Sequence, residues 1–301
     1  GRPNTAGSYL AHDPGARVRL GIVVSGYLRA LGIAMAVPIL NHLFMGFAGF
    51  LQLRSADATW AEAVRAAAGA PLNYALVQAA SVGVIFIVAF PHRARGERFL
   101  DAVQVRPIVG GVAALCFGAG MLLQLPLAEL GNLAQEIWPM SFDDLARRHR
   151  LVNPTTWSGG MSVLLALVLV APVTEELLFR GWLLRDLEQR YGTSAALLWS
   201  SALFGLVHLE ASAIVYATLA GLILGSVTLR TGSTVASIAM HAGVNSLPLL
   251  LPTTLVRIEG FNTLDQQVEH ISPWLLLLCL GGATLALTVV WRSTESVPPG
   301  G

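Results

Sequence analysis

Long apolar segments separated by short polar stretches dominate the chain. A helix that crosses the hydrocarbon core of a bilayer needs roughly 20 mostly apolar residues, and eight segments approach that length. They cover residues 30–53, 72–90, 107–128, 160–187, 195–209, 212–230, 233–252 and 273–291. The fifth is short and is expected to stop within the membrane or to tilt little. The pattern predicts an all-α, polytopic integral membrane protein with about eight transmembrane helices.

The composition agrees with this pattern. Of the 301 residues, 54% are hydrophobic and 12% are charged, whereas a soluble domain carries about 25% charged residues. The net charge is +1, and the sequence contains no basic block, so nucleic acid is not expected as a partner. Cys116 and Cys279 lie inside apolar segments and are interpreted as core side chains, not as a disulfide or a zinc site.

The arginines predict the orientation, because cytoplasmic loops of membrane proteins carry the basic excess. With eight spans, the side of the two termini holds Arg2, Arg17, Arg19, Arg93, Arg95, Arg98, Arg106, Arg185, Arg190, Arg230 and Arg292. The other side holds Arg54, Arg65, Arg147, Arg148, Arg150 and Arg257. Both termini are therefore predicted to be cytoplasmic, and segment 129–157 is predicted to be an external, helical stretch. All the basic residues are arginine, which is typical of a GC-rich bacterial genome and so indicates a bacterial inner membrane.

Few ionisable side chains lie within the apolar segments. They are Arg29, His42, Glu175, Glu176, Arg180, His208 and His241, joined by the polar Asn41 and Asn245. A charge near the middle of a membrane helix costs about 2.5–3.5 kcal/mol on insertion scales, so such residues are candidates for function. Three pairs have a spacing of four residues and share a helix face: Glu176 with Arg180, Phe204 with His208, and His241 with Asn245.

The two adjacent glutamates are expected to have different roles. Neighbouring residues point about 100° apart around a helix, so they cannot share one partner. Glu176 can pair with Arg180 one turn later, whereas Glu175 has Phe179 at that spacing and no cation. Glu175 is therefore the candidate general base.

Depth along the segments indicates that these side chains meet. Glu175, His208 and His241 lie at a similar distance from the cytoplasmic ends of their segments, at about 1.5 Å per residue. They are predicted to line one conical intramembrane cavity that opens to the cytoplasm. A glutamate and a histidine could there activate water, and a histidine and Asn245 could donate hydrogen bonds to the oxyanion that forms when water attacks an amide.

The same residues carry a family resemblance. The stretches EELLFR (175–180), FGLVH (204–208) and HAGVN (241–245) resemble, in order and in placement, three motifs of the CAAX protease and bacteriocin-processing (CPBP, or Abi) family, which includes the type II CAAX prenyl endopeptidases. The resemblance implies an eight-helix intramembrane endopeptidase in which Glu175 and His208 activate water and His241 and Asn245 form the oxyanion site. Glu176, Arg180 and Phe204 would then be supporting residues.

The resemblance covers roughly residues 158–250 and suggests a division of one membrane domain into three parts. Residues 1–157 would hold three membrane helices and the external loop, residues 158–252 the catalytic core, and residues 253–301 the last membrane helix and a disordered tail at 293–301.

Family members are commonly labelled metalloproteases, but the zinc motif H-E-x-x-H is absent here. Glu175, His208 and His241 have the side-chain types of a catalytic zinc site with water as fourth ligand. A metal-free mechanism uses the same residues, and we favour it.

The remaining intramembrane residues have simpler interpretations. His42 is expected to be a hydrogen-bond partner between helices, Asn41 to have no catalytic role, and Arg29 to mark the cytoplasmic edge of the first span. Trp182, Trp199 and Trp274 are expected to be interfacial anchors.

The leading hypothesis is therefore an intramembrane protease that acts on a peptide or protein substrate and contacts membrane lipids. The substrate would be a prenylated CAAX-like protein, or a bacterial peptide in bacteriocin maturation or self-immunity. The alternative is a non-proteolytic immunity or partner-binding protein with the same fold. A proton-coupled transporter would need an inverted repeat, and none is found.

Overall fold

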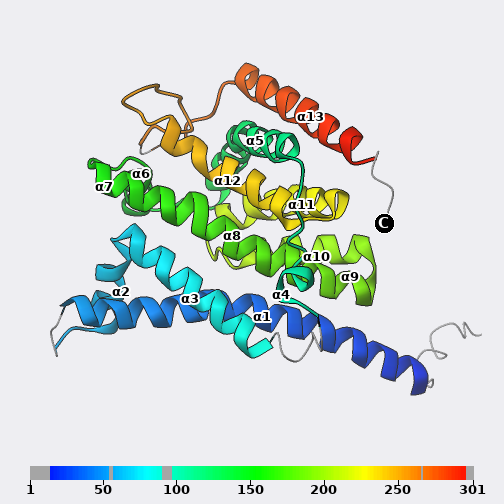
Figure 1. The fold of residues 1–301 in the computed structure, drawn as a ribbon. Helices are drawn as coiled ribbons and strands as arrows, with labels where there is room; N and C mark the ends of the chain where they lie inside the picture. The colour runs from blue at the N-terminus through cyan, green and yellow to red at the C-terminus, as the bar shows by residue number, and fades with distance from the viewer. Residues whose placement is uncertain (1–13, 54–56, 90–96, 266, 296–301) are drawn as a thin grey trace, which may run out of the picture.

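The computed structural model describes residues 14–53, 57–89, 97–265 and 267–295, and within these ranges it contains helices and no strands. The membrane-crossing helices and their neighbours follow in order (Figure 1). They are α1 (Pro14–Leu53), α2 (Trp60–Ala68), α3 (Pro71–Ala89), α4 (Phe99–Ala102), α5 (Gly110–Ile137), α6 (Phe142–Val152), α7 (Trp157–Val163), η2 (Leu164–Val170), α8 (Ala171–Glu176), η3 (Leu177–Leu184), α9 (Arg185–Tyr191), α10 (Thr193–Leu206), α11 (Ala211–Thr231), α12 (Thr234–Leu250) and α13 (Pro273–Glu295). The predicted all-α fold is confirmed.

Six helices are long and apolar enough to cross a membrane: Val24–Leu53, Pro71–Ala89, Gly110–Ile137, Trp157–Tyr191, Ala211–Thr231 and Pro273–Thr294. The other two predicted spans are α10 and α12, apolar helices of 14 and 17 residues. Both are shorter than a full crossing, and α10 ends at Leu206 as the sequence indicated. The chain is thus a polytopic membrane protein in which two short helices stand among longer ones.

One continuous rod, Trp157–Tyr191, runs through α7, η2, α8, η3 and α9. Its two η segments are π-helical, and η2 ends just before Pro172. Proline lacks an N–H and clashes with the preceding turn of an α-helix, and a wider turn is one way to keep the helix continuous around it. The backbone N–H of Ala171 accordingly bonds to the carbonyl of Ala166, five residues back.

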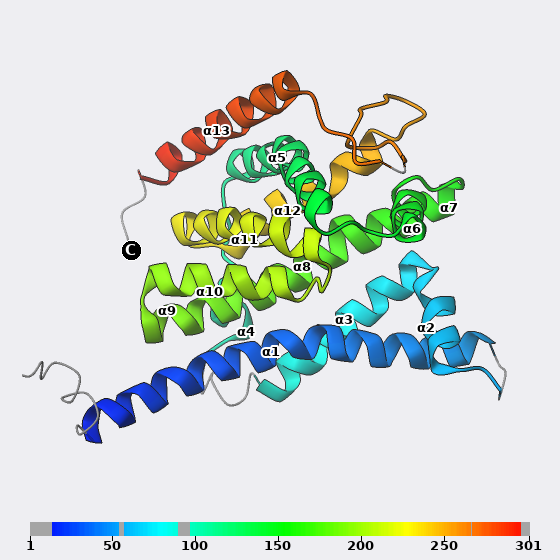
Figure 2. The same ribbon diagram turned by 180° about the vertical axis from the view of Figure 1, so that it is seen from behind.

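The helices stack in layers around this rod (Figures 1 and 2). α13 packs on α5, α5 packs on α11 and α12, α12 packs on η2 and α8, α8 packs on α3, and α3 packs on α1. The contact between α5 and α12 is close because two glycines lie in it. A methyl group added at Gly120 would come within 1.9 Å of the carbonyl oxygen of Met240, and one at Gly243 within 2.0 Å of that of Phe117.

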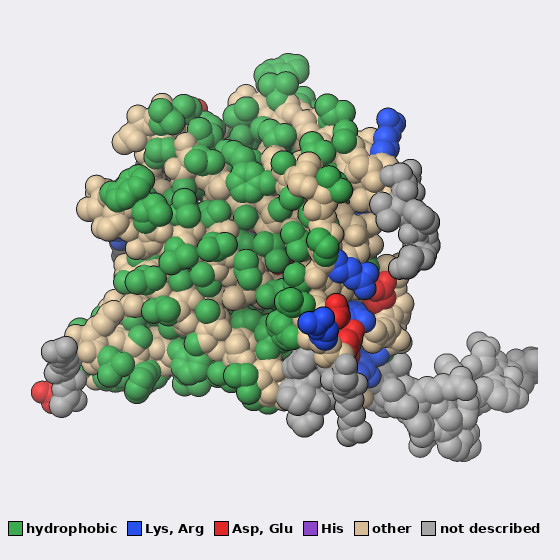
Figure 3. Space-filling view, in the orientation of Figure 1, with side chains coloured by type: hydrophobic (Ala, Val, Ile, Leu, Met, Phe, Trp, Pro, Cys, Tyr) green, Lys and Arg blue, Asp and Glu red, His purple; other side chains and the backbone are tan. Residues whose placement is uncertain are grey.

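Apolar side chains cover the outer surface of the stack (Figure 3). Ile87 on α3 and Leu278 on α13 are 75% and 73% exposed, respectively, as expected where lipid tails replace water as the solvent. On the face that Figure 3 shows, charged side chains gather at the edge where α4 and α9 lie.

Several helix ends differ from the prediction. α1 begins at Pro14 and not near residue 30, so Arg29 lies within the helix, where it contacts Asp186 of α9. α5 continues to Ile137 because Glu129, which favoured an end at residue 128, bonds to His270. α13 continues to Glu295, so residues 293–295 of the predicted tail are helical, and residues 296–301 lie outside the described residues.

Two of the simpler expectations can be compared with the structure directly. His42 accepts a hydrogen bond from the indole Nε1 of Trp60, at 2.9 Å between α1 and α2, which confirms its interhelical role. Trp182 is 5% exposed and packs against Phe86, so its assignment as an interfacial anchor is wrong. η3 turns this indole into the core formed with α3, whereas Trp274 is 77% exposed.

Candidate active site

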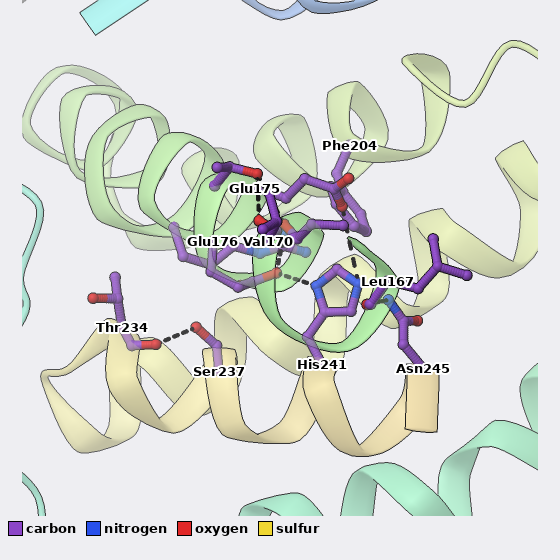
Figure 4. A network of polar contacts seen from close by, with 12 residues as sticks. Leu167, Val170, Glu175, Glu176, Phe204, Thr234, Ser237, His241 and Asn245 are labelled. Carbon is purple, nitrogen blue, oxygen red and sulfur yellow. Dashed lines mark hydrogen bonds and ion pairs between the residues drawn. The ribbon is translucent and has the colours of Figure 1, made fainter. Parts of the chain in front are cut away.

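Glu176, at the end of α8, is the centre of a buried polar cluster (Figure 4). Its Oε1 lies 3.0 Å from Nη1 of Arg180, and neither residue is exposed. The predicted pair is therefore present. The Arg180 guanidinium carbon also lies 4.1 Å from the ring centre of Phe204, which supports the cation further.

The same carboxylate oxygen holds His241 of α12. Nδ1 of His241 is 2.9 Å from Oε1 of Glu176, and its Nε2 is 3.9 Å from Oε2 of Glu175. An ionised carboxylate can only accept a hydrogen bond, so Nδ1 carries the proton. In the neutral imidazole, Nε2 then presents its lone pair toward Glu175, so one histidine lies between two carboxylates.

The π-helical turn explains the position of Asn245. In an α-helix the N–H of Ala171 would bond to the carbonyl of Leu167, but here it bonds to Ala166. The Leu167 carbonyl instead accepts a hydrogen bond of 2.8 Å from Nδ2 of Asn245 (Figure 4). This contact ties α12 to η2 and uses one of the two N–H groups of the Asn245 amide.

His208 follows α10, in the turn that ends with Leu209 in the left-handed conformation (φ 63°). Its Nδ1 lies 2.8 Å from the carbonyl of Phe204 and must donate to it. The Phe204 ring makes edge contacts with the imidazoles of His208 and His241, at centroid distances of 5.1 and 5.8 Å. Phe204 therefore separates the two histidines, and among the described contacts His208 makes no hydrogen bond or ion pair with Glu175.

A cavity of about 730 Å³ joins these side chains. Glu175, His208, His241 and Asn245 all line it, together with Phe204. Its other walls come from α3, α5, α6, α11 and the loop 251–272. The structure thus brings the four predicted catalytic residues to one cavity, although His208 does not lie beside Glu175.

The cavity lies on the side of the molecule opposite to the termini. It extends from the middle of the spans to residues 131–152 and 260–269, and residues 97–106 and 185–193 take no part in it. In Figure 1, α6 and α7 lie at the opposite end of the helices from α9 and the C-terminal end of α13. The expectation that the cavity opens on the side of the termini is therefore wrong. Distance along a span locates a residue near mid-membrane but does not say which end is open.

The zinc hypothesis can be compared with the side-chain positions. A catalytic zinc needs three protein ligands that converge on one point. Among the described residues no three His, Cys, Asp or Glu side chains form such a group. The Nδ1 atoms of His208 and His241 already donate to a carbonyl and to Glu176. In this arrangement the residues present do not fit a zinc ion, and no step is assigned to one.

Sequence reasoning missed two contacts to the glutamates. Gln78 of α3, only 2% exposed, donates a hydrogen bond of 3.2 Å to Oε1 of Glu175. The bond between Glu176 and His241 was also unforeseen. A polar residue in the apolar segment 72–90 was a signal for Gln78, whereas nothing in the spacing indicated the contact between Glu176 and His241.

Comparison with known proteins gives one match. A family model described as Rce1-like, type II CAAX prenyl endopeptidase, matches residues 157–247. No curated protein and no solved structure matches the chain. The matched segment contains all three motifs and the four residues Glu175, His208, His241 and Asn245. The match confirms the resemblance to the CAAX protease and bacteriocin-processing family and identifies residues 157–247 as a type II CAAX prenyl endopeptidase Rce1-like segment.

Proposed function

We propose that the protein is an intramembrane endopeptidase that hydrolyses a peptide bond with a water molecule held between Glu175 and His241. The observation that carries the proposal is the 3.9 Å separation of Oε2 of Glu175 and Nε2 of His241 on the wall of a large cavity. This separation is too long for a direct hydrogen bond and suits a shared water. Such a water donates to both atoms and turns a lone pair toward the substrate.

The reaction then needs a base, an oxyanion donor and an acid. Glu175 takes the proton as the water oxygen attacks the carbonyl carbon, and the second N–H of the Asn245 amide meets the oxyanion. The buried Glu176 carboxylate holds His241 in the tautomer that accepts from water, as a carboxylate orients the histidine of a catalytic triad. When the C–N bond breaks, the proton passes to the leaving amine, with His208 Nε2 as the second relay group on the cavity wall.

This assignment differs from the one that the family resemblance implies. There, His208 shares the activation of water and His241 belongs to the oxyanion site. The distances favour the exchange, because His241 lies next to Glu175 and Phe204 separates it from His208.

The direction of substrate entry follows from the position of the cavity. The arginine excess places the side of the termini in the cytoplasm, and the cavity extends to the other side. The proposed substrate is therefore a membrane-associated peptide that is exposed on the non-cytoplasmic face, as in bacteriocin maturation or self-immunity. A CAAX-like protein lipidated in the cytoplasm would require the reverse orientation.

The replacement Glu175→Gln tests the base. It keeps the shape and the acceptor for Gln78 but cannot take a proton from water, so cleavage should fall by about 10²–10⁴-fold while the yield in membranes stays near wild type. The measurement compares peptides released in vesicles that contain wild type or the variant, by mass spectrometry. Glu188→Gln is the matched control, because Glu188 lies on the same rod, outside the cavity, and bonds only to Thr193. Undiminished cleavage by Glu175→Gln would remove the proposed base.

Metal dependence is tested separately. Activity should survive strong chelators without recovery steps. Loss on chelation, followed by restoration with a single added divalent ion, would contradict the metal-free mechanism.

Orientation is tested by single cysteines at Ser141 and Thr193, labelled in sealed vesicles of known sidedness. A membrane-impermeant reagent should reach position 141 from the non-cytoplasmic side and position 193 from the cytoplasmic side. The opposite labelling would place the cavity mouth in the cytoplasm.

A further inference from the structure

We infer that Asn41 and Gln78 form a positioning pair that orients the carboxylate of Glu175. This inference rests on the proposed function of Glu175 as the base. Both residues lie before the matched segment 157–247, on α1 and α3, so the inference assigns a role at the site to the N-terminal helices.

Two hydrogen bonds connect the three side chains in series. Nδ2 of Asn41 donates to Oε1 of Gln78 over 2.6 Å, and Nε2 of Gln78 donates to Oε1 of Glu175 over 3.2 Å. Gln78 is 2% exposed, so its amide has no water to replace either partner. A buried amide in an apolar environment is costly unless its groups are bonded, and this amide is bonded at both ends.

The series also fixes the direction of each amide. If the Gln78 amide were reversed, its oxygen would face the Glu175 carboxylate, and two acceptors would meet without a proton between them. Asn41 prevents this, because its N–H groups require an acceptor and Gln78 supplies one only in the observed direction. Asn41 therefore acts on Glu175 through Gln78, although it does not touch Glu175 itself.

The consequence for Glu175 is geometric. With Oε1 held by Gln78, Oε2 is the oxygen that points toward Nε2 of His241, at 3.9 Å. A carboxylate free to rotate would occupy this orientation only part of the time. Pre-orientation of a base contributes to the rate of the chemical step and not to the binding of a distant part of the substrate.

The kinetic test uses Asn41→Asp. Aspartate has nearly the same shape but cannot donate, so the Gln78 amide should reverse and its donor should leave Glu175. We expect kcat to fall about 10-fold or more while KM changes by less than about twofold. Gln78→Leu should give the same pattern. Ser81→Ala is the matched control, because Ser81 is buried one turn after Gln78 on α3 and its hydroxyl has no partner among the described residues. Unchanged kcat in Asn41→Asp, or an equal loss in Ser81→Ala, would overturn the inference.

A stability test decides the matter without any activity. In Glu175→Gln the new amide can donate to a reversed Gln78, so Asn41→Asp should lower the midpoint of thermal unfolding less in that background than in wild type, by about 2–6 °C. The same difference should vanish when Gln78→Leu is also present, because the connection is then cut.

The two tests separate the inference from the proposed function. A protein that cleaves nothing but shows this coupling through Gln78 would retain the positioning pair and lose the protease assignment. Coupling that persists in the Gln78→Leu background would be direct repulsion between positions 41 and 175 and would refute the pair.

Discussion

Replacement of Arg180 by methionine should destabilise the whole membrane domain. The side chains of Arg180 and Glu176 are both 0% exposed, and the 3.0 Å contact between them joins two charges within one helix. Methionine fills much of the space but leaves the Glu176 carboxylate buried with His241 as its remaining partner at that oxygen. An uncompensated charge in such a place is far more costly than the loss of an exposed ion pair.

The expected size can be worked from these contacts. Loss of one partner of a buried ion pair costs about 3–5 kcal/mol. The cation also lies 4.1 Å above the Phe204 ring, and this interaction adds up to about 2 kcal/mol when it is shielded from water. His241 continues to donate to Glu176, so the total should remain near about 3–5 kcal/mol. At about 2 °C per kcal/mol for a large domain, the unfolding midpoint should fall by about 6–10 °C.

The assay is thermal unfolding in detergent, followed by tryptophan fluorescence, for Arg180→Met and for the double variant with Glu176→Gln. The double variant removes both charges and should recover at least about half of the loss. Arg190→Met is the control, because Arg190 and Asp186 have the same spacing on the same rod but Arg190 is 41% exposed. It should cost less than about 1 kcal/mol. A midpoint for Arg180→Met within 2 °C of wild type, or a double variant less stable than either single one, would refute the reasoning.

Two further predictions concern helix packing and the loop at the cavity. Gly243→Ala should push α12 away from α5, since the added methyl group would meet the carbonyl of Phe117, and should lower both stability, by about 1–3 kcal/mol, and kcat; Gly118→Ala, which meets nothing within 4 Å, should be neutral or slightly stabilising. Equal effects of the two substitutions would contradict the close approach of the helices. The hydrogen bond from His270 to Glu129, aided by a second carboxylate, raises the pKa of His270 above its ordinary 6.5. Its contribution to stability should therefore be complete below about pH 6.5 and disappear as the pH rises through the higher folded-state pKa, so the unfolding midpoint should fall over that range in wild type and not in His270→Gln.

The sequence predicts best the contacts that lie within one helix. Glu176 pairs with Arg180, and Phe204 contacts His208 through its carbonyl, because helix geometry alone brings residues four apart together. The number and nature of the apolar segments likewise follow from composition, which decides which residues can face lipid.

Contacts between helices could not be predicted in this way. The contact between Glu176 and His241 depends on how α12 packs against α8, and the bond of Asn245 depends on a π-helical turn that changes which carbonyl is free. The open side of the cavity was also missed, because residues 131–152 and 260–269 form its mouth and have no periodic pattern. Their polar sequence is compatible with either side.

The separation of the cavity mouth from the C-terminal end of α13 has a practical consequence. An affinity handle attached after α13 would anchor the protein to a sensor surface by the face that substrates do not use. Immobilised in a lipid nanodisc by this handle, the molecule would present residues 131–152 and 260–269 to the flowing solution, so that candidate peptides could be screened for capture on the inactive Glu175→Gln variant.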